Sequence, residues 1–165
     1  MADAIIRNHL LVVPDAAARG LVVPCVGRLT DHLRTCGKHF VSLENAEVLP
    51  FAGGAKQDGG RALVALNRIV WAHEYAALTG DEHQRRHYVA EDEAAVRLHF
   101  AEPYGLTTEG YMVRTWLALP SRFGVVREPR PAAASARAER HAEEMSKLSY
   151  VVVNRDALSA VSFLD

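Results

Sequence analysis

The two halves of this 165-residue chain repeat one another. The segment AIIRNHL at 4–10 matches AAVRLHF at 94–100, and GLVV at 20–23 matches GYMV at 110–113 with the same spacing. LVALNR at 63–68 then matches YVVVNR at 150–155, with a spacing that is three residues shorter. Matches in a constant order at nearly constant spacing indicate a duplicated unit. Each copy has about 70 residues, which is enough for one small core.

The repeat divides the chain into two predicted domains. We expect a first domain at 1–77, a linker at 78–93 and a second domain at 94–165. The polar stretch TGDEHQRRHYVAEDE at 79–93 has the composition of a linker rather than of a core segment. His9 and His99 are counterparts in the matched segments, and we expect them to serve packing or a shared interface.

Within each copy the apolar residues form short runs that are separated by Gly, Pro and Asp. Runs of this kind, rich in Val, Ile and aromatic residues, are typical of β-strands. The expected strands are 5–13, 20–23, 39–43, 61–66 and 69–73, and then 95–101, 110–115, 122–126, 149–153 and 158–163. Five short strands per copy predict a mainly all-β protein of two tandem five-stranded small barrels, since a barrel removes most exposed strand edges.

Two segments have helical character instead. Residues 28–38 (RLTDHLRTCGK) predict one or two helical turns that end at Gly37. The Ala-rich stretch in the second copy predicts a short helical insertion near 131–147. Met145 and Leu148 are its only larger apolar residues, so it is either a marginal helix at a loop tip or a surface that docks onto a partner.

The overall composition excludes several classes of protein. Apolar residues make up 49% of the chain and charged residues 24%, which is typical of a folded globular protein. The formal net charge of -1 provides no general attraction to nucleic acid or to anionic membranes. The N-terminus lacks the basic start of a signal peptide, and no apolar run approaches the length of a bilayer. We therefore expect a cytoplasmic protein without membrane insertion, in which Cys25 and Cys36 are reduced.

The sequence contains none of the common nucleophile, phosphate-loop or zinc-protease motifs. His83 and His87 have the spacing of a metal pair on a helix, but a charged linker is the simpler interpretation. The glycines in 53–60 suit a hairpin better than a phosphate loop. Cys36 is followed by cations that could activate a thiol, but it has no partner acid in the sequence pattern. We therefore predict no enzymatic activity, no cofactor and no bound metal.

Parts of the sequence resemble the Sm-like proteins. HFVSLENAEV at 39–48 is similar to their third-strand signature, and VNRDAL at 153–158 and LNRIV at 66–70 resemble the tight turn between their last two strands. RLTDHL at 28–33 is similar to a segment of uncharacterised bacterial proteins with such barrels. The resemblance implies that each copy is an SH3/Sm-like barrel. RNA-binding members carry an Asn in the third strand and Arg-Gly in the last turn. Here Phe40 or Val41 and two Asn-Arg pairs stand in their place, which disfavours the family's base recognition.

We therefore predict a non-enzymatic protein–protein interaction or scaffold module that presents strand edges within a homo-oligomer or a larger assembly. The alternative is RNA binding on a basic and aromatic face of the second barrel, because stacking and phosphate pairing act together on single strands. The residues of that face are Arg114, Trp116, Arg122, Arg127 and Arg130. Another interpretation of the same pattern is that the aromatic rings fill the core and the arginines face water.

Overall fold

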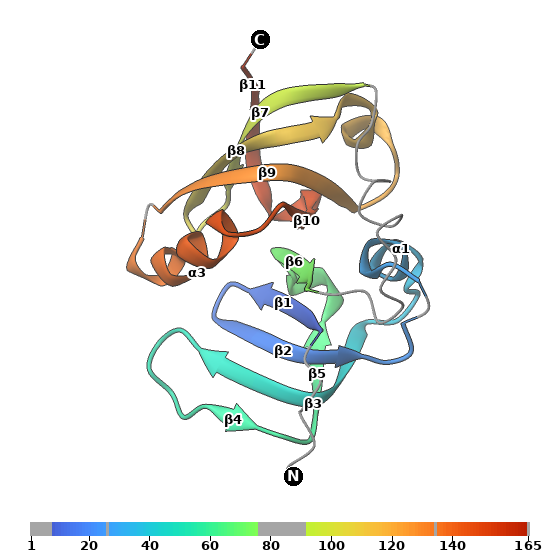
Figure 1. Ribbon diagram of the computed structural model, residues 1–165, viewed down its shortest axis with the longest axis vertical. Coiled ribbons are helices and arrows are strands. Elements are labelled where there is room, and N and C mark those ends of the chain that lie inside the picture. Colours follow the sequence, from blue (N-terminus) through green and yellow to red (C-terminus); the bar gives the residue numbers. More distant parts are fainter. Residues whose placement is uncertain (1–7, 26, 76–91, 134, 165) are drawn as a thin grey trace. The chain divides into compact units, whose positions relative to one another are not determined.

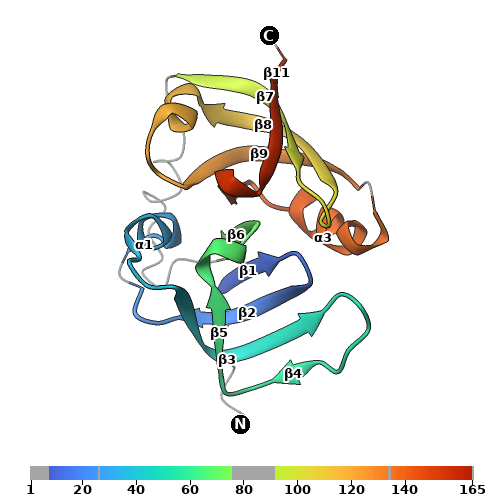
Figure 2. The same cartoon turned by 180° about the vertical axis from the view of Figure 1, so that it is seen from behind.

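The computed structural model (Figures 1 and 2) describes residues 8–25, 27–75, 92–133 and 135–164. The chain divides into two compact units, unit 1 at Met1–Asp81 and unit 2 at Glu82–Asp165. The expected linker at 78–93 lies outside the described residues, except for Asp92 and Glu93. The described residues form antiparallel strands and two helices, which confirms the mainly-β prediction. Neither of these helices is long and apolar enough to cross a membrane.

In the part of unit 1 that the structure describes there are six strands, one helix and one 3₁₀ turn. In chain order they are β1 (His9–Val13), β2 (Ala16–Val22), α1 (Leu29–Thr35), β3 (Phe40–Pro50), β4 (Gln57–Asp58), β5 (Arg61–Ala65), η1 (Leu66–Arg68) and β6 (Trp71–Glu74). The strand order is β6-β1-β2-β3, and both β5 and β4 pair with the far side of β3. The last strand of the unit therefore pairs with the first.

The core of unit 1 lies on the inward face of these strands and under α1. Leu10 and Leu11 of β1 and Trp71 of β6 are completely buried. Leu33 of α1 is 2% exposed, so the helix covers part of the core. The two-residue period of β3 places Val41 and Leu43 inward and leaves the side chains between them outward.

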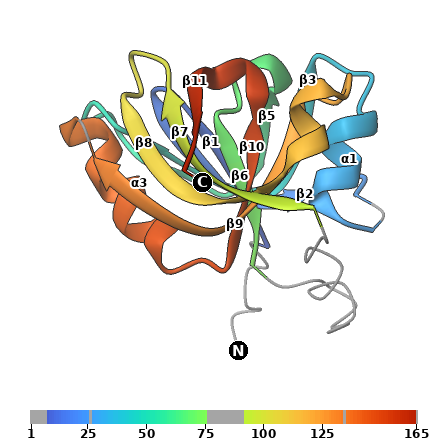
Figure 3. The same ribbon diagram turned by 90° about the horizontal axis from the view of Figure 1, so that it is seen from above.

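The described residues of unit 2 form five strands, one helix and two 3₁₀ turns. They are β7 (Glu93–Phe100), β8 (Leu106–Val113), η2 (Arg114–Ala118), β9 (Phe123–Ala133), α3 (Ala136–Ser146), β10 (Tyr150–Asn154), η3 (Arg155–Ala157) and β11 (Leu158–Phe163). The strand order is β11-β7-β8-β9-β10, with every neighbouring pair antiparallel. Figure 3 shows β8 and β9 curving side by side.

The Ala-rich segment forms α3, which is shorter than the predicted span because β9 continues to Ala133. The helix packs against β9 of its own unit and buries Ala138, Ala142 and Met145. Its N-terminus is capped by Ser135, whose Oγ accepts a hydrogen bond from the backbone N–H of Ala138 at 3.3 Å. Neither a loop-tip helix nor a free arm therefore describes this insertion, since small alanine side chains let it lie close to the sheet.

The two units share one unusual backbone detail. Asn45 in β3 and Glu128 in β9 have positive φ angles of 50° and 51°, and each stands at a β-bulge. Opposite each bulge is a glycine, Gly20 in β2 and Gly110 in β8. A Cβ atom on Gly20 would lie 2.7 Å from the carbonyl oxygen of Glu44, and one on Gly110 would lie 2.6 Å from Val126 Cγ1. The matched glycines therefore occupy the same structural position in both units.

The strand registers correct the alignment of the first repeated segment. His9 is opposite Gly20, whereas the residue opposite Gly110 is Val96. The structural counterpart of His9 is therefore Val96 and not His99. The β7–β8 connection is longer than the two-residue β1–β2 turn, and this difference shifts the register. The expectation of equivalent roles for His9 and His99 is accordingly wrong.

The sequence alignment of Asn67-Arg68 with Asn154-Arg155 also differs from the structural alignment. The backbone N–H of Leu66 donates to His39 O at 2.9 Å, and that of Arg155 donates to Arg122 O at 2.8 Å. Leu66 is the first residue of η1 and Arg155 is the first residue of η3, so Leu66 corresponds to Arg155. Each 3₁₀ turn leads from the strand beside β3 or β9 into the last strand of its unit. Among the described residues no strand pairing joins the two ends of either strand order, so the sheet is open.

Candidate functional site

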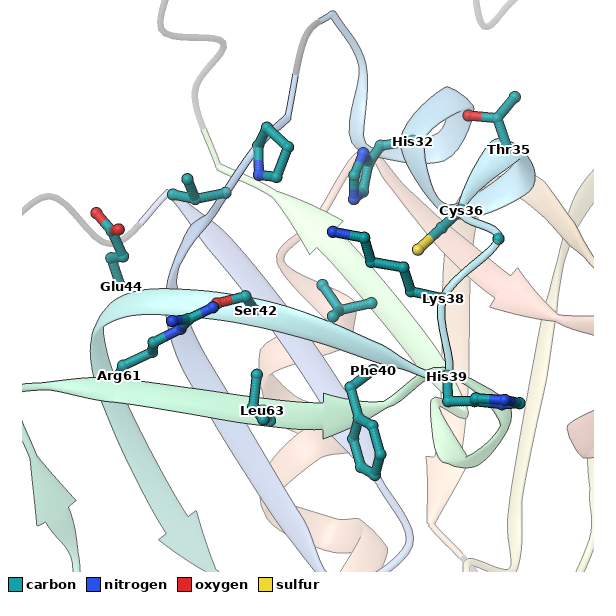
Figure 4. Close-up of a pocket in the computed structure, with 14 residues that line it drawn as sticks. His32, Thr35, Cys36, Lys38, His39, Phe40, Ser42, Glu44, Arg61 and Leu63 are labelled. Carbon is teal, nitrogen blue, oxygen red and sulfur yellow. The ribbon is translucent and has the colours of Figure 1, made fainter.

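A groove on the outer face of unit 1 is the candidate site. It has a volume of about 780 Å³ and lies between the end of α1, the first half of β3 and β5 (Figure 4). We call it the β3–β5 groove. Phe40 and Leu63 line its apolar part, with exposed fractions of 51% and 60%. Large apolar side chains so exposed on adjacent strands are typical of interaction surfaces.

The register of β3 and β5 explains how the groove acquires these side chains. Phe40 is opposite Ala65, Ser42 is opposite Leu63, and Glu44 is opposite Arg61. Residues at alternate strand positions point to the same face, so these three pairs share the outer face of the sheet. The side chains between them, such as Val41 and Val64, are buried in the core.

Two cations and one acid line the groove. Arg61 donates from Nε to Ser42 Oγ at 2.8 Å, and neither Arg61 nor Lys38 forms an ion pair with a described residue. Figure 4 shows the side chain of Lys38 extending into the groove. The acid is Glu44, on the strand position opposite Arg61. Burial, and then the nearby His9 and Lys38, lower the pKa of His32 below its ordinary value, so His32 is neutral at pH 7.

The free backbone edge of β5 borders the groove. Leu66 N–H donates to His39 O, so the next pair, Phe40 and Ala65, is a non-hydrogen-bonded pair of the antiparallel ladder. By this alternation the backbone N–H and C=O groups of Arg61, Leu63 and Ala65 point away from β3. No described strand pairs with that side of β5. An edge of this kind can accept an additional strand.

The counterpart surface in unit 2 is covered. The matching 3₁₀ turns make Phe123 the counterpart of Phe40 and Val152 the counterpart of Leu63. Phe123 is 1% exposed and Val152 is 0% exposed. The same face of the same two strands is therefore buried in one copy and open in the other. Two identical copies would have the same exposure on this face, so the exposed face is a property of unit 1 and not of the repeated unit.

A buried histidine and a carboxylate attach α1 to the sheet beside the groove. The backbone N–H of Val22 donates to His9 Nδ1 at 3.0 Å, and His9 Nε2 lies 3.5 Å from Glu74 Oε2. The same carboxylate oxygen accepts a hydrogen bond from the backbone N–H of Leu29 at 2.9 Å. These contacts hold the start of α1 against β1 and β6, and the end of the same helix lines the groove.

The two thiols differ in their relation to the groove. Burial and the negative charge of Glu74 raise the pKa of Cys25 to about 11, so this thiol is protonated at neutral pH. Cys36 lines the groove and is partly exposed. No hydrogen bond from Cys36 to a histidine or a carboxylate is present among the described residues.

The residues predicted to bind nucleic acid are not presented as one open surface. Trp116 is 3% exposed and packs over Gly124, so its ring is not available for stacking on a base. Arg114 lies 3.7 Å from Asp92, and Arg122 lies 3.0 Å from Asp156.

The other two arginines are both on β9. Arg127 pairs with Glu93 at 2.7 Å and lies over the Tyr111 ring at 5.1 Å. Hydrogen bonding to Glu93 is the largest cause of the raised pKa of Arg127. Arg130 is exposed and forms no ion pair with a described residue. Only Arg130 thus remains as an unpaired cation of this set, and RNA binding stays a prediction that filter binding over a salt series would test.

The candidate metal pair His83 and His87 lies outside the described residues. Within the described ranges no three His, Cys, Asp or Glu side chains are placed to hold a metal ion together. Sequence reasoning missed Phe40 and Leu63 as site residues. Within β5 the sequence gives no signal for Leu63, because residues 62–65 form a continuous apolar run in which exposed and buried positions look alike.

Comparisons with protein-family models, with curated proteins and with solved structures gave no match to this chain.

Proposed function

We propose that this protein is a non-enzymatic interaction module that binds an extended segment of a protein partner as an additional strand on β5, within a larger assembly. The observation that carries the proposal is the unpaired edge of β5 beside the exposed side chain of Leu63. Strand addition supplies main-chain hydrogen bonds for affinity, and the neighbouring groove supplies side-chain specificity.

We further propose that each unit is a small barrel of the Sm-like kind. The shared strand order, the return of the last strand to the first, and the 3₁₀ turn before that strand support this architecture. In unit 1 the turn η1 connects β5, at one end of the order, directly to β6, at the other end. Such a connection brings the two ends of the sheet toward each other, as a small barrel requires.

The structure offers a variant that blocks the β5 edge. Ala65 has φ -64°, which is the angle that proline adopts, and its N–H points away from β3 by the ladder alternation. Ala65→Pro therefore removes one outward donor without removing a β3–β5 hydrogen bond. The preceding Val64 is in a strand, which is the conformation that proline favours before it. Ala65→Ser keeps the N–H and is the matched control.

The test is a pull-down from the native host with nuclease treatment, followed by mass spectrometry. Partners retained by the wild type and by Ala65→Ser after nuclease, but lost by Ala65→Pro, support the proposal. Equal retention by Ala65→Pro contradicts it, provided that circular dichroism shows the same fold. Loss of all partners on nuclease treatment contradicts it as well, because the partners would then be tethered by nucleic acid.

A further inference from the structure

We infer that the segment accepted by β5 belongs to a different protein and carries an acidic residue and a large apolar residue at alternate positions, two residues apart. This inference rests on the proposed strand addition and specifies the chemistry of the partner. It follows from three features of unit 1, which are the spacing of side chains along β5, the charge of the groove and its exposed apolar surface.

The spacing sets the pattern of the partner. Arg61 and Leu63 occupy alternate positions of β5 and point to the outer face. Neighbouring strands place their side chains side by side on the same face, about 5 Å apart. A strand added to β5 would therefore present two alternate side chains, one beside Arg61 and one beside Leu63.

Charge determines the first of these side chains. The guanidinium of Arg61 is held by Ser42 and has no described acid in an ion pair with it. Lys38 adds a second cation on the other side of the groove, and Glu44 is the only acid among the lining residues. An acidic side chain beside Arg61 would gain an opposite charge and would approach from the side away from Glu44. A basic side chain there would meet Arg61 as a like charge, which is unfavourable between adjacent strands.

Apolar surface determines the second side chain. Leu63 is 60% exposed, and Phe40 lies diagonally across the β3–β5 pair from it with 51% exposed. A large apolar side chain beside Leu63 would cover the exposed surface of Leu63, whereas Phe40 lies on β3, on the far side of β5 from the added strand. A small or charged side chain would leave this surface in water.

A second copy of this chain fits the groove less well. The described strand order ends at β11 and at β4. β4 has only two residues, Gln57 and Asp58, so it cannot present two side chains at alternate positions. β11 is longer and pairs only with β7 among the described strands. One face of β11 carries Val161 and Phe163, and the other carries Ala160 and Ser162. Neither face includes an acid within Leu158–Phe163, so Arg61 would remain without an opposite charge. The charge of the groove therefore favours a different protein as the partner.

The experiment measures the binding of two labelled peptides to the full chain by fluorescence polarisation. The matched peptide is an extended, threonine-rich segment as long as β5, with glutamate and leucine two positions apart. The control peptide has the same composition, with the glutamate moved by one position so that it faces the other side of the strand. We expect the matched peptide to bind about fivefold more tightly, since only the pair with Arg61 is lost in the control and such a pair contributes up to about 1 kcal/mol.

Variants of the chain assign this preference to the groove. Arg61→Gln should remove both the preference for the matched peptide and most of the salt dependence of its binding. Leu63→Ser should weaken the matched peptide about tenfold while leaving the salt dependence in place. Equal binding of the two peptides, or an unchanged preference in Arg61→Gln, overturns the inference.

The outcomes also separate this inference from the proposed function. If neither peptide binds but Ala65→Pro still loses partners in the pull-down, strand addition stands and the acidic-apolar pattern is wrong. If light scattering shows self-association that Ala65→Pro abolishes and the matched peptide does not compete with, the occupant is a second copy and the inference is overturned. If Ala65→Pro retains its partners and binds the matched peptide as the wild type does, both proposals fail.

Discussion

Replacement of Gly124 by alanine should destabilise unit 2 through a clash with Trp116. Gly124 lies in β9, and a Cβ atom placed on it would be 2.2 Å from both Cδ2 and Cε2 of the indole ring. Trp116 is held in η2 and is only 3% exposed, so the ring has little room to move away. A methyl group can therefore be accommodated only if β9 or η2 shifts.

The size of the effect follows from the nature of the contact. Additional methyl groups in a packed core cost about 1–3 kcal/mol, and the upper part of this range applies because a rigid ring is in the way. For a small domain with a urea dependence of about 1–3 kcal/mol per molar, a loss of about 3 kcal/mol lowers the unfolding midpoint by about 1–3 M. Urea titrations should be followed by tryptophan fluorescence and by circular dichroism, since two units can unfold in separate steps.

Two comparisons make this prediction refutable. Gly37→Ala is the control, because nothing lies within 4 Å of its added Cβ, and it should change the free energy of unfolding by less than about 0.5 kcal/mol. In a Trp116→Leu background, which removes the ring, Gly124→Ala should cost less than in the wild type. If Gly124→Ala is neutral in the wild type, or costs the same in both backgrounds, Trp116 does not occupy the space over Gly124.

Four further outcomes are expected, from two substitutions and from changes of pH. Gly20→Ala should lower the unfolding free energy by about 1–3 kcal/mol in urea titrations, because its Cβ would lie 2.7 Å from a backbone oxygen of β3; a neutral result would contradict the bulge geometry. Ser135→Ala removes the cap of α3 and should lower the unfolding free energy by about 1 kcal/mol, measured by thermal melting of the helical signal. An unchanged melting curve would show that the cap is not formed. In a Cys36→Ser background, alkylation of Cys25 should stay slow until the pH approaches the thiol pKa of about 11. Because this folded pKa lies above the ordinary 9.0, the unfolded chain releases the proton first, and stability should fall as the pH rises from about 9 to 11. Fast alkylation at neutral pH would show that the thiol is not shielded.

The repeat was visible in the sequence, but its register was not. The matched glycines Gly20 and Gly110 are true counterparts, because a bulge in the next strand excludes any side chain at both places. The match between His9 and His99 fails, because the lengths of the first hairpin connections differ. Sequence identity cannot reveal such a shift, since apolar residues on neighbouring strand positions look alike in a short run.

The helical segments show a similar division. Alanine content predicted the helix that forms α3, but composition could not show whether it packs on a partner or on its own sheet. Its contact with β9 depends on the close approach that Ala138 and Ala142 permit. The surface proposed for RNA binding was chosen from residue types alone. The structure places Trp116 in the core and pairs three of its arginines with carboxylates, which are contacts between residues far apart in the chain.

The sequence by itself determined the β class and the doubled pattern, because short apolar runs and their repetition are visible within a few residues. Only the tertiary structure decided which face of each strand is covered. Phe40 and Leu63 are open, whereas their counterparts Phe123 and Val152 are buried. Burial depends on what other segments lie over a strand, and local periodicity carries no information about that.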